Sequence, residues 1–116
     1  MVLLFVLAVG VPQSFADEKG EAKEGEKTYR LLCVSCHGES GKGDGPAAAA
    51  LPTKPRSLVD TQYMKTLSDQ HLFKVIKEGG VSVGKSPLMP AWGGQVKDKD
   101  IWNLIAYIHT LEKSGK

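Results

Sequence analysis

The sequence predicts a small all-α domain with three to four short helices and long loops. Apolar residues recur at helical spacing near the carboxyl end, and no segment shows the sustained alternation of a half-buried strand. Glycine and proline crowd residues 38–57, which favours a long loop. The chain has 116 residues, of which 41% are hydrophobic and 24% charged, so it fits one globular domain.

The amino terminus has the features of an export signal. Residues 2–11 carry no charge and are about half as long as the roughly 20 residues that a membrane-spanning helix needs. Ser14 and Ala16 place small residues at a signal-peptidase site, although no Lys or Arg precedes Asp17. The alternative is a retained membrane anchor. We expect a signal peptide over 1–16 and a single exported domain over 17–116, with 17–24 as a flexible charged lead-in that becomes helical toward its end.

Each predicted helix rests on a local signal. A first helix is expected to run from Gly25 to Cys33, with Tyr29 on its apolar side. Ser68 is a plausible N-cap for a helix over 69–78, which the pair Gly79 and Gly80 would end. Shorter helical turns are expected over 47–51 and 61–66. The clearest periodicity predicts a last helix between Asp98 and Lys113, with an apolar stripe made of Ile101, Leu104, Ile105, Ile108 and Leu111.

Such short helices bury too little apolar surface to offset the entropy of ordering about a hundred residues. A disulfide, a metal or a large cofactor must therefore complete the core. Cys33 and Cys36 are the two cysteines, and they stand in the motif Cys-x-x-Cys-His that ends at His37. This is the attachment pattern of c-type haem, in which both thiols form thioethers and the histidine becomes the proximal iron ligand.

Three other roles for the motif are less well supported. A thioredoxin-like dithiol needs a neighbouring strand, which is not predicted. A zinc site needs a fourth ligand, for which His71 and His109 are the nitrogen donors without close sequence spacing. A disulfide between Cys33 and Cys36 would close too short a loop to stabilise the fold.

Met89 is the best candidate for the second axial ligand. It lies between Pro87 and Pro90, and these prolines stiffen an extended loop between two helices. Met64, His71 and His109 are interpreted as core, surface or packing residues. A His/Met pair raises the reduction potential and leaves no open iron position, as suits a protein that passes electrons.

These blocks, in this order, resemble the class I cytochrome c family, and specifically its small bacterial single-haem members. The similarity covers nearly all of residues 22–114. It rests on Gly25 and Tyr29 ahead of the haem motif, on the loop Gly43-Asp44-Gly45-Pro46, on Met89-Pro90-Ala91-Trp92, and on the terminal helix from Ile101 to Tyr107.

The resemblance implies further roles. Gly25 would let the first and last helices cross closely, with Tyr29 near Leu104 and Tyr107. The Pro46 carbonyl would accept the ring N–H of His37. Arg56 and Trp92 match positions that bond the haem propionates, although a solvated arginine and a core tryptophan are the alternatives. Family members often begin the last helix with Ser or Thr, whereas here Lys97 precedes Asp98, so we expect either that Asp98 takes over as the cap or that the helix starts less firmly.

The glycines of residues 38–45 lack the ending of a phosphate loop and are interpreted as letting backbone approach the flat haem. The net charge of +2 argues against nucleic acid as a partner. Six lysines flank the proposed haem loops and either form a basic rim that steers acidic redox partners or are ordinary surface. They are Lys42, Lys54, Lys65, Lys85, Lys97 and Lys99.

The sequence therefore predicts a periplasmic, monomeric electron carrier with one covalently bound haem c and transient redox partners, and not an enzyme. Two alternatives remain. One is a haem sensor or peroxidase-like protein with an open sixth position, and the other is a fixed electron-transfer subunit of a larger oxidoreductase.

Overall fold

The computed structural model describes residues 2–4 and 19–114. Within these residues it contains helices and loops and no strand, so the all-α prediction is confirmed. The α-helices are α1 (Ala22–Leu32), α2 (Val34–His37), α3 (Thr61–Met64), α4 (Asp69–Glu78) and α5 (Asp98–Ser114). Three 3₁₀ turns, η2 (Ala48–Ala50), η3 (Gly80–Val83) and η4 (Trp92–Gly94), interrupt the loops.

The predicted signal peptide lies outside the described residues except for 2–4. In the described part of the chain, no helix combines the length and the apolar character needed to cross a membrane. The charged lead-in becomes helical at Ala22, where α1 begins.

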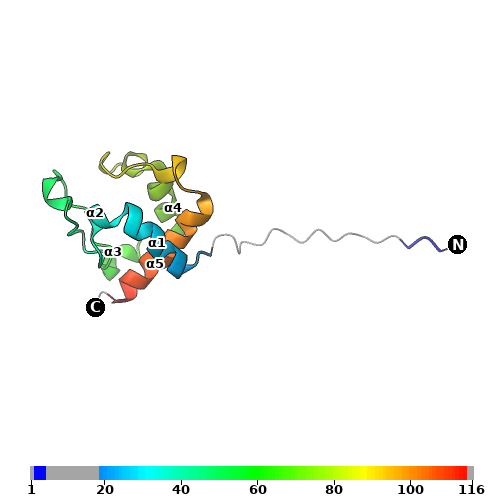
Figure 1. The fold of residues 1–116 in the computed structure, drawn as a ribbon. Helices are drawn as coiled ribbons and strands as arrows, with labels where there is room; N and C mark the ends of the chain where they lie inside the picture. Colours follow the sequence, from blue (N-terminus) through cyan, green and yellow to red (C-terminus); the bar gives the residue numbers. More distant parts are fainter. Residues whose placement is uncertain (1, 5–18, 115–116) are drawn as a thin grey trace.

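Helices α1 and α5 cross at the centre of the molecule (Figure 1). A Cβ atom on Gly25 would collide with the backbone carbonyl of Asn103, so only glycine allows this approach. The rings of Tyr29 and Tyr107 lie 5.1 Å apart at an interplanar angle of 57°. The expected roles of Gly25 and Tyr29 at the crossing are thus confirmed.

Helix α4 packs on the other side of α5. The Ser68 hydroxyl accepts a hydrogen bond from the backbone N–H of His71 (3.0 Å), which confirms the predicted N-cap. Phe73 of α4 stacks on Trp102 of α5, with ring centroids 4.5 Å apart. This stacking fixes α4 against the amino-terminal half of α5.

The predicted cap of α5 is wrong. Asp98 is the first helical residue, and its carboxylate contacts the ammonium of Lys77 (2.9 Å). Instead, the Asp100 carboxylate accepts from the backbone N–H of Lys97 (3.0 Å), and the Lys97 carbonyl accepts from Ile101 (3.2 Å). This is the acidic half of a capping box, which allows a lysine to hold the cap position.

The core is small and centred on α5. It consists of the buried residues of α5 together with side chains from α1, α3 and α4. Its buried members are Tyr29, Met64, Leu72, Ile76, Ile101, Leu104, Ile105, Ile108 and Leu111. Helix α2 contributes none of them, because no residue of α2 is fully buried.

Candidate functional site

A bend at Cys33 separates α1 from α2 and places the Cys-x-x-Cys-His motif on its own short helix. The Cys33 N–H still donates to the α1 carbonyl of Tyr29 (2.9 Å), while the Cys33 carbonyl accepts from His37 (2.8 Å). Cys36 and His37 therefore lie in the single turn of α2, directly after Cys33. This confirms the expectation that the first helix runs up to Cys33, which is the C-cap of α1.

The glycine-rich loop packs on the backbone of α2. The N–H of Gly43 donates to the His37 carbonyl (2.8 Å), and the N–H of Gly45 donates to the Cys36 carbonyl (3.1 Å). A Cβ on Gly43 would collide with the Pro55 carbonyl, and one on Gly45 with the Ser35 carbonyl. For Gly43 and Gly45, the atoms that crowd the Cβ position belong to protein backbone, and the approach of this loop to a flat ring stays a prediction.

Both thiols are free. Burial, together with the nearby Cys36 thiol, raises the pKa of Cys33 to about 12, so the Cys33 thiol is neutral at physiological pH. A zinc ligand would need to be a thiolate. Among the described residues, no group of three or more His, Cys, Asp and Glu side chains could hold a metal ion. Two free thiols at this spacing are what thioether attachment of haem requires.

The His37 imidazole is half-buried at the end of α2. Burial lowers the pKa of His37, and the interaction of the imidazole with the backbone of Arg56 raises it by a smaller amount. The buried Nδ1 atom of His37 has no hydrogen-bond partner. A neutral imidazole with an unpartnered nitrogen fits an axial iron ligand. The hydrogen bond from His37 to the Pro46 carbonyl is not formed here, so that role for Pro46 stays a prediction.

Met89 is half-buried and packs against the core. Its carbonyl accepts from the N–H of Gly80 (3.0 Å), and its own N–H donates to the Ser86 carbonyl (3.3 Å). A Cβ on Gly80 would collide with the Ser86 carbonyl. The pair Gly79 and Gly80, predicted only as a helix stop, therefore also anchors the backbone of the Met89 loop. The sequence contains the glycine pair, but no pattern in it indicates that this pair contacts the Met89 loop.

The other candidate axial residues are accounted for by contacts within the protein. Met64 is 2% exposed and belongs to the core. The Nε2 atom of His109 lies 2.7 Å from the Asp69 carboxylate, and its Nδ1 lies 3.6 Å from that of Glu112. His71 is half-buried in the first turn of α4. These environments agree with the interpretation of all three as packing or surface residues.

The two residues expected at the haem propionates differ in their surroundings. The guanidinium of Arg56 lies 3.5 Å from the ring centroid of Tyr63 and 3.7 Å from the Asp60 carboxylate. Trp92 is half-buried in η4 and packs against the core. Arg56 already has two partners within the protein, while Trp92 fits the alternative of a core tryptophan. A propionate contact of either residue remains a prediction.

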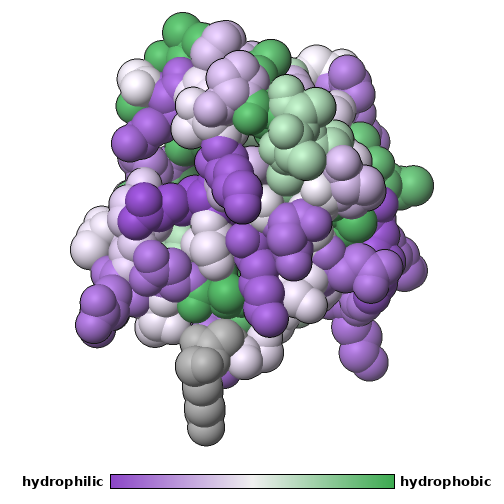
Figure 2. Space-filling model, turned by 90° about the vertical axis from the view of Figure 1, so that its left-hand side faces the viewer, coloured by the Kyte–Doolittle hydropathy of each residue, from purple (hydrophilic) through white to green (hydrophobic). Residues whose placement is uncertain are grey.

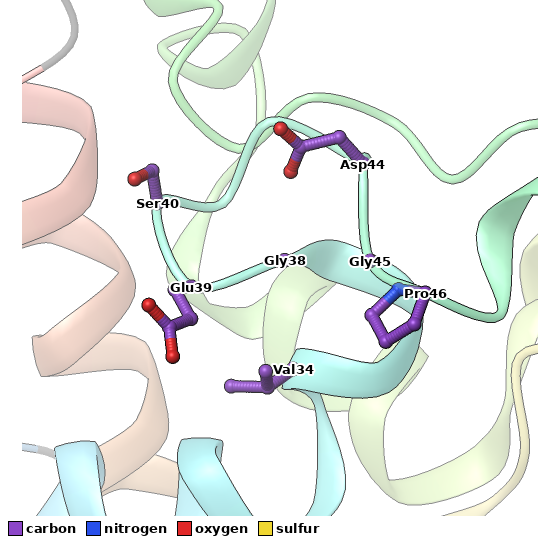
Figure 3. Close-up of a pocket in the computed structure, with 7 residues that line it drawn as sticks. All are labelled: Val34, Gly38, Glu39, Ser40, Asp44, Gly45 and Pro46. Atoms are coloured by element: carbon purple, nitrogen blue, oxygen red, sulfur yellow. The ribbon is translucent and has the colours of Figure 1, made fainter.

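A pocket of about 460 Å³ lies between α2 and the glycine-rich loop that follows it (Figure 3). Its lining includes Val34, Pro46 and the acidic residues Glu39 and Asp44. Neither cysteine nor His37 lines it. The pocket is therefore not the site that the motif would form.

In Figure 1, α2 and the loop that contains η2 lie at the left of the folded domain, away from the drawn amino terminus, and the loop of residues 80–94 runs along its top. Seen from the left, hydrophobic side chains gather in the upper part of the surface and hydrophilic ones below (Figure 2). Val81 and Leu88, which flank the Met89 loop, are 65% and 51% exposed.

Comparison with known proteins agrees with this geometry. Residues 20–108 match the family described as "Cytochrome C oxidase, cbb3-type, subunit III". The chain belongs to this cytochrome c family. It is a class I single-haem c-type cytochrome, and the family carries covalently bound haem c and transfers electrons.

Two curated relatives of the cytochrome differ in size. The cbb3-type cytochrome c oxidase subunit FixP of Bradyrhizobium diazoefficiens is 31% identical over 91 residues, which are 78% of this chain and 28% of the relative. The chain thus spans little more than a quarter of FixP. Cytochrome c6 of Picosynechococcus sp. is 30% identical over 119 residues, which cover 99% of this chain and 91% of the relative.

The fold of the cytochrome also resembles a solved structure. Cytochrome c6 from the diatom Phaeodactylum tricornutum superposes with a TM-score of 0.61 at 23% identity, covering 84% of this chain and all of the diatom protein. At this identity the likeness shows the fold alone. It supports the cytochrome c fold as predicted from the sequence.

Proposed function

We propose that this cytochrome carries one electron at a time between redox proteins, with a single haem attached to Cys33 and Cys36. His37 and Met89 are its axial ligands. The observation that carries the proposal is the bend at Cys33 together with the turn of α2, which carry two free thiols and an imidazole whose pKa is lowered by burial, in the order of the haem motif. When bound, the haem iron supplies the redox chemistry, accepting one electron from a donor protein and releasing it to an acceptor.

The protein's own residues determine what this site can do. The hydrogen bonds that hold the Met89 loop to Gly80 limit how far the thioether can move. A histidine on one side and a methionine on the other leave no coordination position for a substrate. The proposal is therefore an electron-transfer protein and not an enzyme. A haem sensor or peroxidase-like protein would need Met89 away from the iron.

The proposed partners are transient donor and acceptor proteins, and the proposed state is a periplasmic monomer after removal of residues 1–16. All six lysines of the expected basic rim are exposed. They support steering of acidic partner surfaces, which predicts electron-transfer rates that fall as ionic strength rises. Val81 and Leu88 add exposed apolar surface beside the Met89 loop, which suits brief contact with a partner.

A second candidate is a fixed subunit of a larger oxidoreductase. The alignment with FixP favours it, because FixP is named as a subunit of a cbb3-type oxidase. The alignment with cytochrome c6, which covers 91% of that relative, supports the free carrier. Gel filtration of a native extract separates them, since a free carrier elutes as a small monomer and a fixed subunit elutes with a large complex.

The test of haem attachment is expression in a host with cytochrome maturation machinery, followed by acid–acetone extraction and a reduced pyridine spectrum. We expect the haem to stay with the polypeptide and to show two thioethers. Cys33→Ala and Cys36→Ala should each shift the spectrum to that of one thioether, whereas Ser35→Ala, at the exposed position between them, should leave it unchanged. A colourless protein, or haem that is fully extracted from the wild type, would refute the proposed function.

A further inference from the structure

A buried hydrogen bond ties α1 to the residue that follows His37. The Tyr29 hydroxyl donates to the carbonyl oxygen of Gly38 at 2.6 Å, and Tyr29 is only 1% exposed. Burial, with a smaller contribution from Cys33, raises the pKa of Tyr29 above its ordinary value, so the hydroxyl remains a donor throughout the physiological range. Neither the motif nor the periodicity of the chain indicates this bond.

The other hydrogen bonds around this point are local. The His37 carbonyl accepts from Gly43 (2.8 Å), and the Gly38 N–H donates to Val34 (2.9 Å). The Gly38 carbonyl also accepts from Gly41 (3.2 Å). All of these partners lie within six residues of His37. The His37 N–H also donates to the Cys33 carbonyl at the end of α1 (2.8 Å), but among the described residues the bond from Tyr29 is the side-chain hydrogen bond that links this backbone to the packed helices.

Gly38 allows the backbone conformation at this link. Its φ of 82° lies in the region that favours glycine, and a Cβ there would also collide with the Asp44 carboxylate. The Tyr29 ring is held in turn by Tyr107 of α5, with centroids 5.1 Å apart. The end of α2 is therefore connected through one side chain to the crossing of α1 and α5.

We propose that the Tyr29 hydroxyl is a positioning group for His37, which sets the orientation of the imidazole by fixing the Gly38 carbonyl to the helix crossing. This inference rests on the proposed function, in which His37 is an axial ligand. Tyr29 does not itself act on the iron. Loss of the Tyr29 hydroxyl frees the Gly38 carbonyl from the helix crossing. The backbone at the end of α2 can then move, which allows the imidazole plane of His37 to rotate.

The experiment compares Tyr29→Phe with Tyr107→Phe in the haem-loaded ferric protein. Each variant removes one hydroxyl from the same pair of rings and keeps the ring, but no hydrogen bond of the Tyr107 hydroxyl is found in the part of the chain that the structure describes. The readouts are the haem-methyl NMR resonances, whose spread depends on the orientation of the axial imidazole, and the midpoint potential. We expect Tyr29→Phe to displace both, and Tyr107→Phe to leave both close to wild type.

Two outcomes overturn this inference, and a third overturns the proposed function. If Tyr29→Phe lowers the melting temperature but retains the wild-type haem-methyl pattern and potential, the hydroxyl is only structural and the inference is overturned. The same holds if both variants displace the resonances equally. If the wild type itself lacks covalently bound haem, the proposed function fails first, and this result is read from the pyridine spectrum before any variant is compared.

Discussion

The backbone carbonyl of Asn103 on α5 occupies the space that a Cβ atom would need on Gly25 of α1. One residue further toward the carboxyl end, Leu104 is only 1% exposed. The side-chain amide oxygen of Asn103 also accepts from the backbone N–H of Glu21 (2.8 Å), which precedes α1. Asn103 thus bonds the residue before α1 through its side chain, and its backbone lies close against the first turn of α1.

Gly25→Ala should therefore force α1 and α5 apart and lower the free energy of unfolding by about 1–3 kcal/mol, as expected for an overpacked interior. Chemical denaturation of the haem-loaded protein measures the loss. Gly94→Ala is the matched control, because no atom lies within 4 Å of the Cβ that it would add. Its effect should stay within roughly 0.5 kcal/mol. Equal effects of the two substitutions would contradict the close crossing.

Met89→Ala should keep the haem attached but lower the midpoint potential and open the iron to carbon monoxide, because a thioether ligand raises the potential. Redox titration and CO binding to the reduced protein measure these changes. Met64→Leu conserves volume in the core and should cost less than about 1.5 kcal/mol of stability without changing ligation. If Met64→Leu opens the site and Met89→Ala does not, the assignment of the axial methionine is reversed.

Gly80→Ala should loosen the Met89 loop although residue 80 is not a ligand. The added Cβ collides with the Ser86 carbonyl, so the loop must shift and the bond from residue 80 to the Met89 carbonyl weakens. The expected result is a weaker sulfur-to-iron absorption band in the ferric protein, with the haem still attached. An unchanged band would show that the loop does not depend on this anchor.

The stability of the protein should fall in alkali partly because of Tyr29. Its pKa is raised from 10.0 in the folded state by burial, so above pH 10 the unfolded chain loses this proton before the folded protein does. Above pH 10 the folded protein therefore binds more protons than the unfolded chain, and for this reason the free energy of unfolding decreases as the pH rises. Tyr29→Phe removes this contribution, so the drop in stability between pH 8 and pH 11 should be smaller than in the wild type. An equal or larger drop in the variant would contradict the assignment.

The parts of the fold that depend on neighbours in the sequence were predicted correctly. Ser68 caps α4 because its hydroxyl reaches a backbone N–H only three residues away. The stripe from Ile101 to Leu111 is buried as expected, since residues at helical spacing share one face. The family resemblance correctly placed Gly25 at the helix crossing. The cap of α5 is an exception, because the Asp100 carboxylate accepts from Lys97 only three residues away, whereas Asp98 was expected and instead contacts Lys77, 21 residues away.

The sequence by itself determined the helices, the haem motif and the chemical class of the protein, because these depend on residue types at short, fixed spacings. Only the tertiary structure decided which distant groups meet. It placed the Tyr29 hydroxyl on the Gly38 carbonyl, Gly80 under the Met89 loop, and the loop glycines against the backbone of α2. Such contacts follow from the packing of separate segments, and spacing along the chain carries no information about which backbone atoms that packing brings together.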